Sequence, residues 1–179
     1  TTLTAAYVAW PWCYVLHVGD SQAFRVRDQK IRQITRDQTV AQTLLESGMQ
    51  DSEIPVNFWH TLESCISASP KHPQPELYRL ELKANDSLVL NSDGLTRHVE
   101  ANEINSVLNG SDTVEEKCQQ LVAKANEQGG RDNITIVIAE FDGTPDANKV
   151  CGDDKHDSAI QSMADTAIDE NFGVSSDPI

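Results

Sequence analysis

Short stretches with a strand-like hydrophobic pattern dominate the chain, and the longer helical patterns come late in it. Runs rich in Val, Tyr, Trp and Leu, or alternating between apolar and polar residues, predict strands at residues 3–10, 12–18, 23–27, 30–34, 77–82, 87–90 and 134–141. Pro11 separates the first two runs and Asp28-Gln29 separates the next two, so two hairpins are expected.

Apolar residues at helical spacing predict three helices. The two longer ones span residues 101–108 and 113–128, and Thr113 is the expected N-cap of the second because acidic residues follow it in the first turn. A shorter helix is expected over residues 38–47, ended by Gly48. Because strands outnumber helices and the long helices come late, the pattern predicts α+β layers rather than regular βαβ units.

The chain has 179 residues, of which 39% are hydrophobic, and this suffices for one ordinary domain with a core. That domain is expected over residues 1–141, where the last strong strand pattern ends. Residues 142–179 carry nine acidic and two basic side chains and few large apolar ones. This composition predicts an acidic, disordered tail.

Charge and missing patterns exclude several classes of protein. The chain has 28 acidic against 14 basic residues, a formal charge of -14, which argues against binding a nucleic acid backbone. It contains no run of 18 apolar residues, and residues 1–6 lack the features of a signal peptide, so a cytoplasmic protein without membrane contact is expected. Its four cysteines form no C-x-x-C pair and its five histidines show no zinc-site spacing.

Three acidic turns flank the predicted strands. Asp20 and Asp93 each closely follow a strand, Asp132 closely precedes one, and each has a glycine within two residues. Asp-Gly and Gly-Asp are ordinary turn dipeptides, so each turn taken alone is explained as a chain reversal. Three converging carboxylates would repel one another unless a divalent cation neutralised them, and ligand sets made only of oxygen favour Mg²⁺ or Mn²⁺.

The same turns carry a resemblance to a known family. The matching segments are residues 14–23 (YVLHVGDSQA), 88–96 (LVLNSDGLT) and 130–137 (GRDNITIV). A threonine pair at residues 1–2 and the segment ITRD at residues 34–37 are similar to two further motifs. From residue 1 to about 141, the chain resembles the C-terminal two-thirds of metal-dependent 2C-type serine/threonine protein phosphatases.

The resemblance implies a fold and an activity. The fold is an α-β-β-α sandwich of two antiparallel sheets flanked by helices, incomplete here at the N-terminus. The activity is hydrolysis of phosphoserine and phosphothreonine esters in phosphorylated proteins. In the complete domain a binuclear Mn²⁺ or Mg²⁺ site supplies a metal-bound water as the nucleophile, so no side chain is expected to act as one.

The resemblance also implies roles for individual residues. Asp93 corresponds to a metal ligand, and Asp132 to the aspartate that completes the shell of the same ion. Asp20 corresponds to a residue that in many members belongs to an additional, weaker metal site, and a structural role is the alternative. Asn133 is expected to fix the loop by hydrogen bonds, and Gly94 to be a backbone-turn position.

The chain also departs from the family pattern. The family's first metal-ligand segment, with its Asp-Gly-His-Gly-Gly-like turn, and the arginine that grips the substrate phosphate have no counterpart. Gln38 stands where a histidine is usual. Two interpretations remain open: a partial phosphatase sequence that is inactive alone, or a degenerate phosphatase-like domain that binds phosphoproteins or regulates a partner.

Overall fold

Two antiparallel sheets form the centre of the molecule. The computed structural model describes residues 1–68 and 72–143. One sheet has three strands in the order β1 (Leu3–Ala9), β2 (Trp12–Val18) and β5 (Glu76–Glu81). The other has four strands in the order β4 (Lys30–Gln33), β3 (Gln22–Arg27), β6 (Ser87–Asn91) and β7 (Ile136–Glu140).

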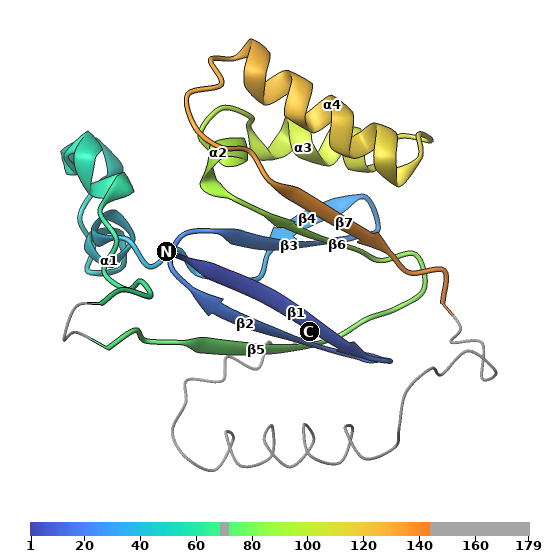
Figure 1. Cartoon of the computed structure of the whole chain (residues 1–179), viewed down its shortest axis with the longest axis horizontal. Coiled ribbons are helices and arrows are strands. Elements are labelled where there is room, and N and C mark those ends of the chain that lie inside the picture. The colour runs from blue at the N-terminus through green and yellow to red at the C-terminus, as the bar shows by residue number, and fades with distance from the viewer. Residues whose placement is uncertain (69–71, 144–179) are drawn as a thin grey trace.

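The helices group into two regions (Figure 1). α1 (Val40–Glu46) and two short 3₁₀ helices (Asp51–Glu53 and Val56–His60) lie beside the sheets, in the connection from β4 to β5. α2 (Asp93–Thr96), α3 (Ala101–Leu108) and α4 (Val114–Glu127) follow β6, and α3 and α4 lie over the outer face of the four-stranded sheet. Thr113 caps α4 as predicted: its hydroxyl accepts from the Glu116 amide and the Glu116 carboxylate accepts from the Thr113 amide.

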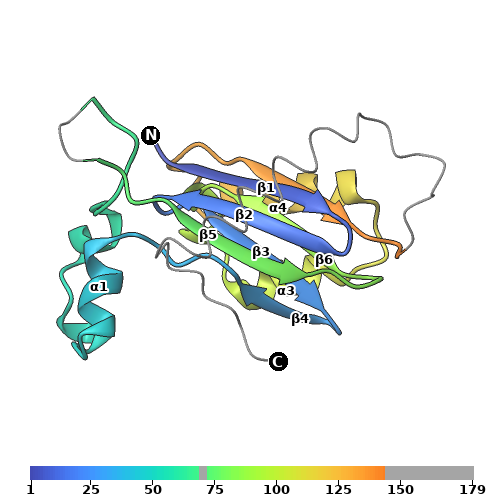
Figure 2. The same cartoon turned by 90° about the horizontal axis from the view of Figure 1, so that it is seen from below.

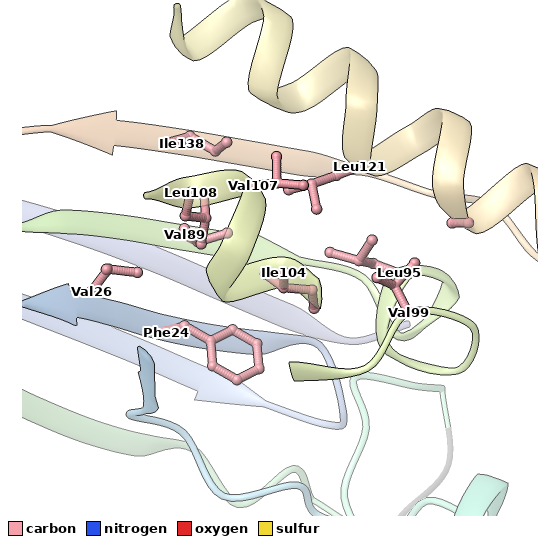
Figure 3. Close-up of a cluster of buried hydrophobic side chains, with 11 residues drawn as sticks. Phe24, Val26, Val89, Leu95, Val99, Ile104, Val107, Leu108, Leu121 and Ile138 are labelled. Atoms are coloured by element: carbon pink, nitrogen blue, oxygen red, sulfur yellow. The ribbon is translucent and has the colours of Figure 1, made fainter. Parts of the chain in front are cut away.

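The main core lies between the four-stranded sheet and these helices. Figure 3 shows side chains from β3, β6 and β7 pointing toward those of α3 and α4. Ile104 and Leu121 from the helices and Val89 from the sheet have no exposed surface. A second cluster, which includes Cys13, Val15, Ala23, Leu82 and Leu88, fills the space between the two sheets. The β–β–α layering therefore follows from two separate apolar contacts, one on each face of the four-stranded sheet.

The outer face of the three-stranded sheet is apolar and lacks a helical cover in the described part of the chain (Figure 2). Leu3, Tyr7, Trp12 and Leu16 on this face are each nearly two-fifths exposed. The second outer helical layer of the expected sandwich is thus not among residues 1–68 and 72–143. No helix in those ranges is long and apolar enough to cross a bilayer.

The predicted elements agree with the structure in kind and order. Both hairpins are confirmed, and all seven strands and three helices lie within two residues of their predicted bounds. The short helix α2, the two 3₁₀ helices, and the bridge between Thr39 and Leu62 that ties the irregular connection together were not predicted. The predicted acidic tail lies outside the described residues, apart from its first two.

Arg27 of β3 forms an ion pair with the buried Asp86 of the β5–β6 connection, at the end of the sheet opposite the acidic turns. Arg27 donates from Nε and Nη2 to the two carboxylate oxygens of Asp86, at 2.7 and 2.6 Å. Asp86 also accepts from the amide of Lys83, and Arg27 donates to the carbonyl of Glu81 in β5. The Asp86 side chain is 1% exposed, so Arg27 takes the place of water as the partner of its carboxylate.

Candidate functional site

Strand register brings the three acidic turns to one end of the four-stranded sheet. Gln22 at the start of β3 pairs with Asn91 at the end of β6, and Asn91 also pairs with Ile136 at the start of β7. Asp20 lies two residues before Gln22, Asp93 two after Asn91, and Asp132 four before Ile136. Antiparallel pairing therefore places all three carboxylates at the same end of the sheet.

Arg97 holds Asp93 and Asp132 together. It donates to the carboxylate of Asp93, one helical turn earlier in the chain, and from Nη1 to Oδ2 of Asp132 at 2.7 Å. The three side chains are between about a quarter and two-fifths exposed. Two carboxylates that are 39 positions apart in the sequence thus converge on a single positive charge.

The sequence reasoning missed Arg97, although a signal was present. Asp93 and Gly94 were interpreted as a turn, and this is wrong, since both belong to the first turn of α2. On a helix, residues four apart face each other, and an acidic residue followed four positions later by an arginine favours an ion pair. A helical interpretation of residues 93–97 would have found the contact.

Gly94 is required for close packing rather than for a turn. A Cβ atom at this position would lie 2.4 Å from the carbonyl oxygen of Asn133. That contact is closer than any side chain tolerates, so a glycine lets the loop before β7 approach α2. Hydrogen bonds hold the approach: Ser92 donates from its hydroxyl to the Asn133 carbonyl and accepts from the Thr135 amide.

Asn133 contacts its neighbours through its backbone. Its amide donates to Oδ1 of Asp132, at 2.8 Å, and its carbonyl accepts from Ser92. Both contacts orient the Asp132 carboxylate toward α2. The role expected for Asn133 in fixing the loop thus has a backbone basis, which any residue other than proline could supply.

Asp20 lies where the chain passes from the three-stranded to the four-stranded sheet and is only 9% exposed. Burial raises the pKa of its carboxyl, the negative charges of Asp93 and Asp37 add to the rise, and the positive charge of Arg97 opposes it. Together these influences bring the pKa to about 6. These influences also show that Asp20 lies near the pair that Arg97 bridges. The structure thus brings all three predicted acidic residues into one neighbourhood.

The other predicted motifs gather around Asp20. Thr2 contacts Ser21 through their hydroxyl oxygens, at 2.9 Å, and packs against Gly19, where a Cβ atom would lie 2.3 Å from the Thr2 Cγ2. Asp37 accepts from the side-chain amides of Gln22 and Gln33, at 2.7 and 2.6 Å. The threonine pair and the Thr-x-Asp segment therefore support the turn that carries Asp20.

Two histidines near the acidic turns have structural contacts. His17 is fully buried in β2, with one ring nitrogen 2.9 Å from the Thr4 hydroxyl and the other 2.9 Å from the Arg36 carbonyl. His98 accepts from the amide of Arg131, at 3.4 Å, and so supports the loop before β7. The interpretation of His17 as a packed core histidine agrees with these contacts.

Asp93 and Asp132 fit a hydrated divalent cation. They are two partly exposed carboxylates that already share one positive group, and hard ions prefer oxygen ligands. Residues 1–68 and 72–143 contain no group of three or more His, Cys, Asp or Glu arranged to hold a metal ion. An ion held by this pair would keep several water ligands, as Mg²⁺ readily does.

We expect Asp20→Asn to stabilise the chain at neutral pH. The folded-state pKa of about 6 lies above the ordinary value of 3.8, so between these pH values the folded chain holds a proton that the unfolded chain releases. This contribution to stability is present below about pH 4 and is lost as the pH rises through about 6. The pKa shift corresponds to about 2–3 kcal/mol of unfolding free energy that the wild type loses when Asp20 ionises. Asn has no charge to bury, so Asp20→Asn should not show this loss at pH 7.

Urea unfolding of both proteins between pH 4 and 7 tests this expectation. The difference in unfolding free energy between Asp20→Asn and the wild type should widen up to about pH 6 and then level off. Asp51→Asn, at an exposed position, serves as the control and should show no such trend. A pH-independent difference would refute the assigned environment of Asp20.

Comparisons with known proteins agree with this arrangement. No protein-family model matches the chain. It is 32% identical over 146 residues to the serine/threonine phosphatase stp of Listeria monocytogenes, and the match covers 80% of this chain and 58% of that protein. A structure of the PPM Ser-Thr phosphatase MsPP from Mycobacterium smegmatis, in complex with cacodylate, matches with a TM-score of 0.69 at 30% identity, over 78% of this chain and 62% of the other. The chain is thus similar, over about four-fifths of its length, to serine/threonine phosphatases of the PPM family.

A further PPM relative has a structure with bound metal. The catalytic domain of the phosphatase PstP, in complex with two manganese ions, matches with a TM-score of 0.67 at 32% identity, over 79% of this chain and 59% of that one. The chain thus spans less than two-thirds of the length of these PPM relatives. These similarities confirm the resemblance drawn from the acidic turns, and the two antiparallel sheets with their helices confirm the expected α+β fold.

Proposed function

We propose that the protein containing this chain is a metal-dependent phosphatase that hydrolyses phosphoserine and phosphothreonine esters of proteins. The observation that carries the proposal is the convergence of Asp93 and Asp132 on one positive charge. The names of the relatives, which are serine/threonine phosphatases, support the substrate class. The manganese ions bound to PstP support Mn²⁺ or Mg²⁺ as the cofactor.

In this proposal Asp93 and Asp132 are ligands of one ion, and Asp20 contributes to a weaker site beside it. A bound divalent ion would supply an activated water and neutralise charge on the phosphate. Ser92 and Gly94 position the Asp132 loop against α2, so that both carboxylates keep their separation. No side chain acts as the nucleophile.

The described residues hold only part of such a site. Two carboxylates do not complete a binuclear centre, and no cluster of three metal-ligating side chains is found in residues 1–68 and 72–143. We therefore propose that the 179-residue chain is inactive alone. The same observation favours the second candidate function, a phosphatase-like module that binds phosphoproteins or regulates a partner without hydrolysing them.

A cytoplasmic location remains part of the proposal. Cys13, Cys65 and Cys118, the cysteines among the described residues, are all unpaired. Reduced cysteines are usual in the cytosol, where thiols are kept from forming disulfides. The proposed partner is a phosphorylated protein. No nucleic acid or membrane partner is proposed.

A phosphopeptide hydrolysis assay separates the two functions. We expect the protein expressed from the complete open reading frame that contains this chain to release phosphate from a phosphothreonine peptide when Mn²⁺ is present. Hydrolysis should stop when Mn²⁺ is chelated, and the 179-residue chain alone should show none. Retention of the peptide without hydrolysis, at any Mn²⁺ concentration, would replace the enzyme with the binding module.

A further inference from the structure

We propose that Arg97 is an internal counter-ion that competes with the divalent metal for Asp93 and Asp132. The inference rests on the proposed function, because it assumes that these two carboxylates are metal ligands. It adds a property of this chain: metal binding displaces the guanidinium, and Arg97 therefore lowers the metal affinity of the site.

The geometry places the guanidinium between the two carboxylates. Nη1 of Arg97 lies 2.7 Å from Oδ2 of Asp132, and Nη2 contacts Oδ2 of Asp93. Each carboxylate thus offers an oxygen to a different nitrogen of the same planar group. A metal ion ligated by both of these oxygens would have to lie within a few ångströms of that group.

Electrostatics makes the two occupants mutually exclusive. A guanidinium keeps its positive charge under all ordinary conditions, so it cannot yield the site by losing a proton. Two positive groups between the same two carboxylates would repel each other strongly at a separation of a few ångströms. The guanidinium must therefore leave when a divalent ion binds Oδ2 of both residues.

Arg97 has a route out of the site. Its side chain is 31% exposed, and it starts from the C-cap position of α2, where the helix ends. Rotation toward solvent removes the guanidinium from both carboxylates without unfolding α2. The metal binds only the state in which Arg97 has left the carboxylates. Its binding free energy is therefore reduced by the free energy needed to break the two ion pairs.

The charge balance explains why a metal can still bind. Asp20, Asp93 and Asp132 carry up to three negative charges in this neighbourhood, against one on Arg97. A divalent ion offers twice the charge of the guanidinium. In the absence of metal, Arg97 limits the repulsion between Asp93 and Asp132 and so holds the loop before β7 against α2.

Mn²⁺ titration calorimetry on the 179-residue chain tests the inference, with Arg97→Gln as the decisive variant. We expect Arg97→Gln to bind Mn²⁺ about tenfold more tightly than the wild type, which corresponds to a gain of roughly 1.4 kcal/mol in binding free energy. Without metal, Arg97→Gln should melt at a lower temperature than the wild type, and saturating Mn²⁺ should close that gap. Arg97→Lys, which cannot bridge two carboxylates in the same way, should bind with intermediate affinity.

Arg131→Gln is the matched control. It removes one positive charge from the loop before β7, which carries Asp132, and leaves the ion pairs of Arg97 with Asp93 and Asp132 in place. Its Mn²⁺ affinity should rise far less than that of Arg97→Gln. Equal gains in the two variants would reduce the effect to net charge, and weaker binding in Arg97→Gln would make Arg97 a purely structural tie. Either result overturns the inference.

The same titration distinguishes failure of the inference from failure of the proposed function. If Asp132→Asn abolishes Mn²⁺ binding but Arg97→Gln does not strengthen it, the metal site stands and the competition fails. If neither the wild type nor Arg97→Gln binds Mn²⁺ at a site sensitive to Asp132→Asn, the proposed metal site fails, and the inference fails with it.

Discussion

Replacing Asp132 with Asn is expected to lower Mn²⁺-dependent phosphopeptide hydrolysis by several orders of magnitude in the complete protein. The amide keeps the shape of the carboxylate but removes the negative charge that would bind the ion. Loss of a residue that only orients a ligand typically costs about 10–100-fold, and loss of a ligand itself should cost more. Asp93→Asn should have a comparable effect, because both carboxylates would bind the same ion.

The measurement is the rate of phosphate release from a phosphothreonine peptide over a range of Mn²⁺ concentrations. Glu127→Gln is a suitable control, since it removes one negative charge at an exposed position at the end of α4, near the same loop. Its rate should stay close to that of the wild type. Wild-type turnover in Asp132→Asn would exclude this residue as a metal ligand.

Replacing Arg27 with Met is expected to destabilise the fold by about 3–5 kcal/mol, the cost of leaving a buried charge without its partner. The Asp86 carboxylate is almost fully buried and accepts two hydrogen bonds from Arg27. After the change, only the Lys83 amide among the observed donors would remain. The midpoint and slope of urea unfolding give the change in unfolding free energy.

Two further variants keep this expectation falsifiable. Glu46→Gln breaks a partly exposed ion pair with Arg36 and should cost at most about 1 kcal/mol. Arg27→Met combined with Asp86→Leu removes both charges, and it should be more stable than Arg27→Met alone. If Arg27→Met costs no more than Glu46→Gln, the pairing with the buried Asp86 does not stabilise the fold at this end.

The elements were predictable because their patterns are local. The pairs formed by β1 with β2 and by β3 with β4 join neighbouring segments, and short turns between apolar runs indicate such hairpins. The pairing of β3 with β6, which brings Asp20 near Asp93, joins segments more than 60 residues apart. No local pattern specifies that partner, and the pairing was not predicted.

The candidate site shows the same division. Asp20, Asp93 and Asp132 were found from acidic turns beside strands, but the reasoning from charge required a divalent ion to neutralise them. In the structure a side chain, Arg97, meets part of that requirement. Gly94 was expected to serve a turn, whereas its need arises from the Asn133 carbonyl 2.4 Å from where a Cβ would lie. That contact depends on tertiary packing and cannot be read from residues 93–94.

Counting Mn²⁺ bound to the 179-residue chain, by electron paramagnetic resonance of the free ion, tests the central claim most directly. The account predicts weak binding at a site formed by Asp93 and Asp132, lost in Asp93→Asn and in Asp132→Asn alike and kept in Glu127→Gln. Binding that is unchanged in both aspartate variants would contradict it, because the two carboxylates that converge on Arg97 would then not be metal ligands.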